Sequence, residues 1–143
     1  EYLIKNYNDS GISQVEKGKD GAIVTLGNYL LRALEVRKKL HERHGKEFSI
    51  HILRRIKPID QDVIKKILLE NNYIASIEEG TLMGGLGSIL LEEKNKIGAN
   101  SNFISIGVED KFINAGNSQE CSKEAGIDSD AATKKIVNKF KFS

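Results

Sequence analysis

Residues 73–108 read YIASIEEGTLMGGLGSILLEEKNKIGANSNFISIGV, which is two short apolar segments separated by a glycine cluster and a helical pattern. The first segment, YIASIEE, and the last, NFISIGV, are rich in β-branched and aromatic residues, as is typical of strands. Between them, Ile89, Leu90 and Leu91 lie in a segment of helical length. Two strands joined by one helix predict a right-handed β-α-β crossover with parallel strands.

The same alternation of strand and helix extends toward the N-terminus. AIVTL (22–26) is a β-branched run without polar alternation, as expected of a strand covered on both faces, and FSIHILR (48–54) predicts a second strand. The helix between them has Asn28 as its predicted N-cap and Gly45 as its left-handed C-cap. Asp60 is placed to cap the next helix.

Two helices are predicted after the last strand, a short one around 119–124 and an amphipathic one with Ala132, Ile136 and Phe140 at four-residue spacing. The predicted fold class is α/β, a three-layer α/β/α sandwich around a mostly parallel sheet. Periodicity alone indicates four clear strands.

The N-terminal residues differ in composition from the rest of the chain. Residues 1–20 are polar and rich in turn-forming residues, so we expect a linker arm from an upstream domain, with the folded domain covering 21–143. The first residue is Glu1 and the single methionine is Met83, so we also expect the chain to be a piece of a longer protein.

Composition limits the classes of function. A chain of 143 residues with a formal charge of +2 is the size of one domain and too weakly basic to predict nucleic-acid binding. No apolar run is long enough to predict a membrane span. The single cysteine, Cys121, rules out an internal disulfide and favours a reducing compartment, so the expected location is cytoplasmic.

The glycine cluster is the only stretch with a pattern typical of ligand binding, because glycines at a helix N-terminus can hold a phosphate. A dinucleotide fingerprint would need a third glycine where Leu90 stands, and a Walker loop would need a lysine. A tight strand-to-helix turn anchored by a glutamate is therefore favoured over an anion contact. The candidate residues of this loop are Glu79, Gly80, Gly84, Gly85, Gly87 and Ser88.

Other candidates for chemistry are weaker. Glu78 and Glu79 are adjacent on a strand and point to opposite faces, so they cannot form an acid–base pair. His41 and His44 share a helix face, but no third metal ligand has suitable spacing. We therefore assign no catalytic, cofactor-binding or metal-ligating residue from the sequence.

Four segments in this order resemble the C-terminal domain of the transketolase family. They are AIVTLGNYLLRALEV (22–36), LRRIKPID (53–60), IEEGTLMGGLGS (77–88) and IGVEDKFINAGNSQECSKEAGID (106–128). Within the family, Glu79-Gly80 and the segment 109–116 are most similar to the 1-deoxy-D-xylulose-5-phosphate synthases. Transketolases and the beta chains of 2-oxo acid dehydrogenases are the alternatives.

The resemblance implies a five-stranded mixed sheet whose first strand is antiparallel, with the fifth strand near GISQV (11–15) or near Phe112. It also implies that thiamine diphosphate and magnesium bind to upstream domains of the parent protein. This domain would then pack against those domains and support a homodimer, without catalytic residues of its own. A stand-alone anion- or nucleotide-binding module is the alternative from another class.

Overall fold

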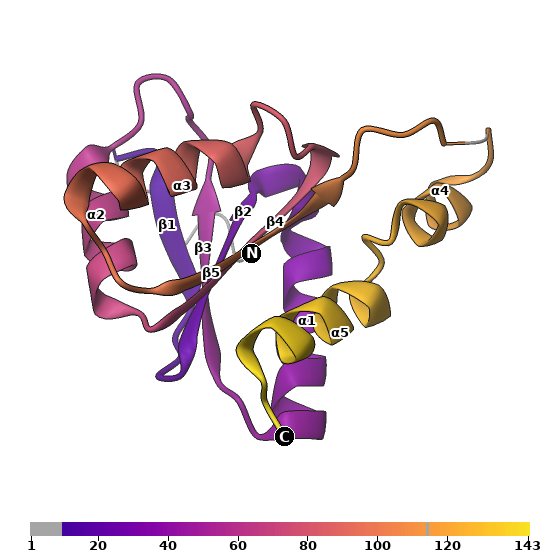
Figure 1. Ribbon diagram of the computed structural model, residues 1–143, viewed down its shortest axis with the longest axis horizontal. Helices are drawn as coiled ribbons and strands as arrows, with labels where there is room; N and C mark the ends of the chain where they lie inside the picture. Colours follow the sequence, from indigo (N-terminus) through magenta and orange to yellow (C-terminus); the bar gives the residue numbers. More distant parts are fainter. Residues whose placement is uncertain (1–9, 114) are drawn as a thin grey trace.

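The computed structural model describes residues 10–113 and 115–143, and it shows one sheet between two layers of helices (Figure 1). The strands follow the order β1-β3-β2-β4-β5 across the sheet. β1 is antiparallel to β3, and the other neighbouring pairs are parallel. The predicted α/β fold with a mixed, mostly parallel sheet is confirmed. The strands are β1 (Ile12–Glu16), β2 (Gly21–Leu26), β3 (Phe48–Leu53), β4 (Tyr73–Thr81) and β5 (Asn102–Val108).

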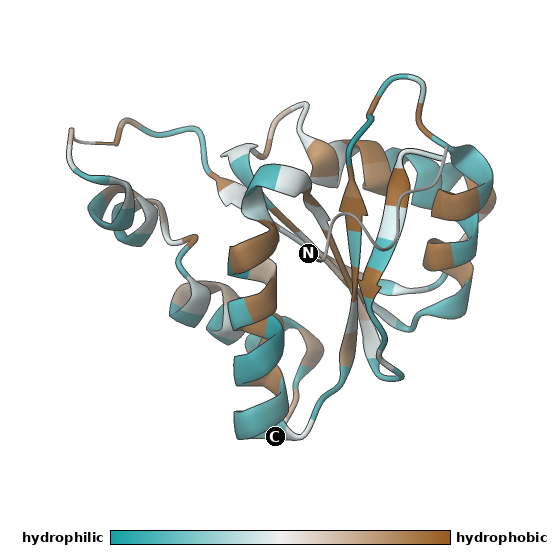
Figure 2. Cartoon of the chain, turned by 180° about the vertical axis from the view of Figure 1, so that it is seen from behind, coloured by the Kyte–Doolittle hydropathy of each residue, from teal (hydrophilic) through white to brown (hydrophobic). Residues whose placement is uncertain are grey.

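The helices cover the two faces of the sheet and bury a separate apolar core on each. Neighbouring strand residues point to opposite faces, so Ile23 joins the core under α1 and α5 while Val24 joins the core under α2 and α3. Figure 2 shows the hydrophobic residues concentrated on the strands and on the helix faces toward them. The helices are α1 (Leu30–His44), α2 (Gln61–Glu70), α3 (Leu86–Ile97), α4 (Ser118–Ala125) and α5 (Ser129–Phe140), with a 3₁₀ turn η1 (Gly27–Tyr29) before α1.

β1 lies within residues 1–20, the range that is predicted to be a linker arm. The folded domain therefore begins before residue 21, the predicted boundary. Ile12 and Ser13 are buried and Gln14 is exposed. A strand at the edge of a sheet keeps polar residues, since only part of it is covered, and this explains its linker-like composition. The fifth strand therefore comes from the GISQV segment, as one of the two alternatives predicted. Residues 1–9 of the predicted linker lie outside the described residues.

The predicted helix caps are confirmed at Gly45 and Asp60, but the predicted N-cap at Asn28 is wrong. Gly45 ends α1 with a φ of 61°, and Asp60 Oδ1 accepts a hydrogen bond from the Val63 N–H at 3.1 Å. Asn28 instead lies inside η1, and α1 begins one residue after Tyr29. The tertiary contact of Tyr29 explains the difference, because its buried side chain donates a hydrogen bond to the Ile127 carbonyl oxygen at 3.2 Å.

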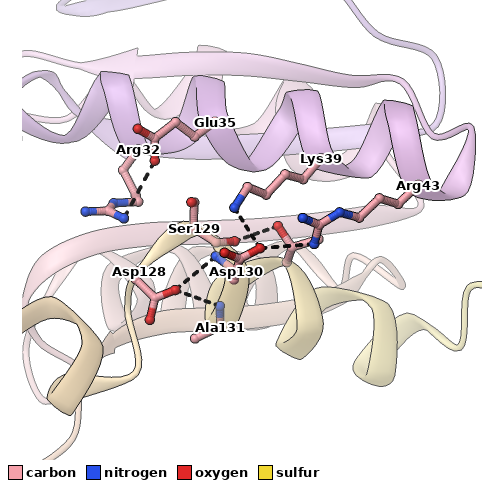
Figure 3. A network of polar contacts seen from close by, with 9 residues as sticks. Arg32, Glu35, Lys39, Arg43, Asp128, Ser129, Asp130 and Ala131 are labelled. Atoms are coloured by element: carbon pink, nitrogen blue, oxygen red, sulfur yellow. Dashed lines mark hydrogen bonds and ion pairs between the residues drawn. The ribbon is translucent and has the colours of Figure 1, made fainter. Parts of the chain in front are cut away.

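An acidic residue at the start of α5 holds this helix against α1 (Figure 3). Asp130 Oδ1 accepts from Lys39 Nζ at 2.7 Å and from Arg43 Nη1 at 3.0 Å. These hydrogen bonds, with that from Lys39 first, lower the pKa of the Asp130 carboxyl below its usual range. One carboxylate thus links two turns of α1 to the first turn of α5.

Candidate functional site

The glycine loop lies at the carboxyl end of β4, the end at which open α/β sheets place their ligands. Two side chains fold it back on itself. Thr81 Oγ1 donates to the Met83 carbonyl oxygen at 3.0 Å, and Ser88 Oγ donates to the Leu82 carbonyl oxygen at 2.7 Å. Gly84 has a φ of 70°, a conformation that favours glycine.

The carboxylate that anchors this loop belongs to Glu78, whose side chain is only 2% exposed. Its Oε1 accepts from the Leu86 N–H at 3.0 Å, and its Oε2 accepts from the Gly87 N–H at 2.9 Å. Both donors belong to the first turn of α3, where the positive end of the helix dipole favours an anion. Glu78 therefore acts as a cap supplied from a neighbouring strand.

The prediction that Glu79 anchors the loop is wrong. Strand alternation turns Glu79 to the opposite face of β4, where it is exposed. In a strand with one solvent-exposed face, polar and apolar residues alternate, and this alternation indicates which of two adjacent glutamates points toward the core. β4 is buried on both faces from Ile74 to Ile77, so the sequence pattern gives no such indication.

Two glycines of the loop are required by close packing. A Cβ on Gly85 would lie 2.5 Å from the Thr81 carbonyl oxygen, and a Cβ on Gly87 would lie 2.7 Å from Ser105 Cβ. No real Cβ tolerates such distances. The first turn of α3 therefore lies directly against β5, at a separation that only glycine permits.

The occupied helix N-terminus limits which ligands the loop fits. The N–H groups of Leu86 and Gly87 already bond to Glu78, so they are not available to a phosphate. Within residues 10–113 and 115–143, no cluster of three or more His, Cys, Asp or Glu side chains could hold a metal ion. The loop therefore does not offer these two N–H groups to the diphosphate of a thiamine cofactor.

Glu79 faces an apolar cavity of about 540 Å³ beyond the carboxyl ends of β4 and β5. α4 forms the far wall and stands out from the body of the domain (Figure 1). The cavity is lined by Glu79, Val108, Ile113, Ala115, Gly116, Ser118, Cys121, Ser122, Ala125 and Ile127. Its lining is an extended apolar surface with one carboxylate at its rim.

Exposed apolar side chains also lie at this end of the sheet, in the segments that follow the carboxyl ends of β2, β4 and β5. Leu31 is 76% exposed and follows β2, Met83 is 75% exposed and follows β4, and Phe112 follows β5 and is fully exposed. We call these three residues the apolar edge. Large apolar side chains exposed together on one end of a domain are typical of a surface that another protein surface covers.

A second cavity, of about 490 Å³, lies on the opposite side of the domain from α4, between α2 and the edge strand β1 (Figure 1). Its floor includes His51 of β3, whose imidazole is half-buried. Burial lowers the pKa of His51 to about 4, because the charged imidazolium would lose hydration there. His51 is therefore neutral near pH 7.

The lowered pKa of His51 predicts a loss of stability in mild acid. The unfolded chain takes up a proton near pH 6.5, and the folded chain does so only near pH 4. The stabilisation is therefore complete above about pH 7 and decreases by about 2 kcal/mol as the pH falls to about 4, after allowing for partial solvent screening. Urea unfolding across this range, compared between the wild type and His51→Gln, measures the difference.

His41→Gln is the matched control for that experiment, because His41 is exposed on α1. Its unfolding free energy should parallel that of the wild type at every pH. A His51→Gln variant that keeps the full wild-type pH dependence would contradict the assignment.

Comparisons with known proteins identify the family. The family described as transketolase, C-terminal domain, matches residues 11–131. The chain is 33% identical over 124 residues to the 1-deoxy-D-xylulose-5-phosphate synthase of Clostridium acetobutylicum, and 31% identical to that of Haemophilus influenzae. These alignments cover 87% of this chain, which spans about a fifth of the length of both enzymes.

Solved structures agree with this assignment. A split-gene transketolase, described as an inactive beta4 tetramer, has a TM-score of 0.81 and 25% identity over 95% of this chain and 44% of its own. A transketolase from Pichia stipitis has the same fold, with a TM-score of 0.70 and 15% identity over 92% of this chain and 18% of its own. In the part of the chain that the structure describes, no helix is long and apolar enough to cross a membrane. The chain belongs to the transketolase C-terminal domain family.

Proposed function

We propose that this chain is the C-terminal packing domain of a thiamine diphosphate-dependent transferase, and that it contributes no catalytic residue. The parent enzyme would be a cytoplasmic homodimer of the 1-deoxy-D-xylulose-5-phosphate synthase type. It would condense pyruvate with glyceraldehyde 3-phosphate on the way to isoprenoid precursors. Thiamine diphosphate and magnesium would bind to the upstream domains.

The observation that carries the proposal is the apolar edge of Leu31, Met83 and Phe112, together with the cavity beside it. This edge occupies the carboxyl ends of the strands, where an α/β enzyme would normally hold its ligand. A packing surface is what these side chains provide. The upstream domains of the parent are the partners we propose for it.

The choice of the synthase over a transketolase rests on similarity in sequence. The synthase relatives are 33% and 31% identical to this chain, and the split-gene and Pichia stipitis transketolases are 25% and 15% identical. The surface of this domain has to match the residues of the upstream domains that it contacts. We therefore expect it to fit the upstream domains of the synthase, the parent with the more similar sequence.

A domain exchange tests this proposal. Residues 10–143 replace the matching C-terminal segment of the Clostridium acetobutylicum synthase, and separately that of the Pichia stipitis transketolase. We expect the synthase chimera to form 1-deoxy-D-xylulose 5-phosphate at a rate within about tenfold of the parent enzyme, and the transketolase chimera to be inactive. The measurement is steady-state product formation with saturating thiamine diphosphate and magnesium.

A second chimera carries Phe112→Asp and Met83→Asp, which place charges on the apolar edge. We expect it to keep the helical content of the first chimera but lose activity, because charged residues cannot be buried against an apolar partner. Full activity of this charged chimera would exclude the apolar edge as the packing surface. An active transketolase chimera would exclude the synthase assignment.

A further inference from the structure

The cavity between α2 and the β1–β3 edge of the sheet has features that a packing role does not use. We call it the α2 groove. It has a volume of about 490 Å³, within the usual range for small-molecule sites. It is lined by Ile12, Gln14, Gly18, Lys19, Ser49, His51, Val63, Lys66, Ile67, Glu70 and Asn71. The three aliphatic residues form its apolar side, and the others supply polar groups of both signs.

The hydrogen bonds of Ser49 and His51 define which imidazole nitrogen can accept. The Ser49 hydroxyl has one hydrogen, which it donates to the Gly21 carbonyl oxygen at 3.1 Å. The 3.1 Å contact between Ser49 Oγ and His51 Nε2 must then have Nε2–H as its donor. A neutral His51 with a proton on Nε2 has an unprotonated Nδ1. No residue of the described chain donates a hydrogen bond to that nitrogen.

Opposite charges border the same groove on α2. Lys66 and Glu70 lie four residues apart and therefore on one face of the helix. Among residues 10–113 and 115–143, neither side chain forms an ion pair within 4.0 Å, although other pairs at this spacing, such as Lys38 with Glu42, do so. The groove thus presents one ammonium and one carboxylate that internal partners do not neutralise.

Two local features of the backbone lie beside the groove. A bulge between Gln14 and Glu16 interrupts the pairing of β1 with β3 beside His51. Bulges are over-represented next to binding sites, because they redirect a strand and its side chains. Gly18 passes so close to the backbone of Phe48 and Ser49 that a Cβ could not fit. The chain after β1 therefore lies directly against the start of β3, at the rim of the groove.

We propose that the α2 groove is a binding site for a small zwitterion, of which a free α-amino acid is the simplest. The carboxylate of the ligand would pair with Lys66, and its ammonium would donate to Glu70 and to His51 Nδ1. A simple anion would satisfy only the lysine and leave the carboxylate and the imidazole acceptor unused. This inference is independent of the proposed function, because it concerns a different face of the domain.

Two-dimensional NMR of the ¹⁵N-labelled 143-residue chain tests the inference. The probes are glycine, L-serine, L-threonine and L-glutamine, added singly at millimolar concentrations, with L-lactate and inorganic phosphate as anions that lack an ammonium group. We expect at least one amino acid to give saturable amide shifts in β1, β3 and α2, together with an upfield shift of the His51 Nδ1 resonance. Lactate and phosphate should leave that nitrogen unchanged.

Matched variants separate binding from nonspecific effects. Lys66→Met and Glu70→Gln should each weaken the saturating amino acid by about tenfold, which corresponds to one lost charge-assisted hydrogen bond. Lys65→Met, one residue away and outside the groove lining, should bind like the wild type. Saturable shifts of equal size from lactate, or no saturable shift with any of the four amino acids, would overturn the inference. Weakening by Lys65→Met as large as that by Lys66→Met would overturn it too.

Discussion

Replacing Glu78 by glutamine should lower the free energy of unfolding by about 3 kcal/mol. The amide of glutamine keeps one acceptor oxygen, so one of the two N–H groups at the start of α3 loses its partner and faces an NH₂ donor instead. An unsatisfied buried donor costs about 1–3 kcal/mol, and loss of the negative charge at the helix N-terminus adds to this. Urea unfolding at neutral pH, followed by circular dichroism, measures the difference.

Glu79→Gln is the matched control, since it makes the same chemical change one residue away on the exposed face of β4. Its effect should stay within about 0.5 kcal/mol, as for most surface substitutions. Equal losses in the two variants would mean that the buried carboxylate contributes nothing specific. Amide hydrogen exchange adds a local readout, because Glu78→Gln should accelerate exchange at Leu86 and Gly87 more than in α1.

Gly87→Ala should destabilise the domain by about 3 kcal/mol. The added methyl group would lie 2.7 Å from Ser105 Cβ and 2.8 Å from Ser76 Oγ, on two neighbouring strands. Neither strand can yield without disturbing the sheet, so α3 would have to move outward and lose contacts with its core. Overpacking in well-packed interiors costs about 1–3 kcal/mol, and a rigid sheet places this site at the upper end.

Gly27→Ala provides the comparison, because the nearest atom to its added methyl group would be a side-chain carbon of Ile52 at 3.8 Å. Neither Gly27 nor Gly87 has a positive φ, so the two substitutions differ in packing and not in backbone strain. We expect Gly27→Ala to be neutral or slightly stabilising. If Gly87→Ala also unfolds at the wild-type urea midpoint, α3 does not pack on β5 as described.

The sequence predicts the central part of the fold well, and the reason lies in burial. β2 and β5 are short β-branched runs, and the helices between strands carry apolar residues at helical spacing, so each element has a pattern of its own. β1 has no such pattern, because an edge strand of mixed polarity has the composition of a linker. Only its pairing with β3, whose partner residues lie 34–41 positions later in the chain, makes Ile12–Glu16 a strand.

The candidate site was harder to predict because its contacts depend on three-dimensional arrangement. Five of the six predicted residues, Gly80, Gly84, Gly85, Gly87 and Ser88, lie in the strand-to-helix connection or at its ends. The choice between Glu78 and Glu79 could not be made from a strand buried on both faces. His51 gave no indication of a role, since its relation to Lys66 and Glu70 arises only when α2 packs beside β3.

The start of α3 is an anion receptor, and Glu78 is an anion tethered to it by the seven intervening residues of its own chain. A tethered ligand acts at a high effective concentration, so a free carboxylate or phosphate in the cell would meet a receptor that is already saturated. A single covalent tether thus turns a common recognition motif of α/β proteins into an element of internal structure.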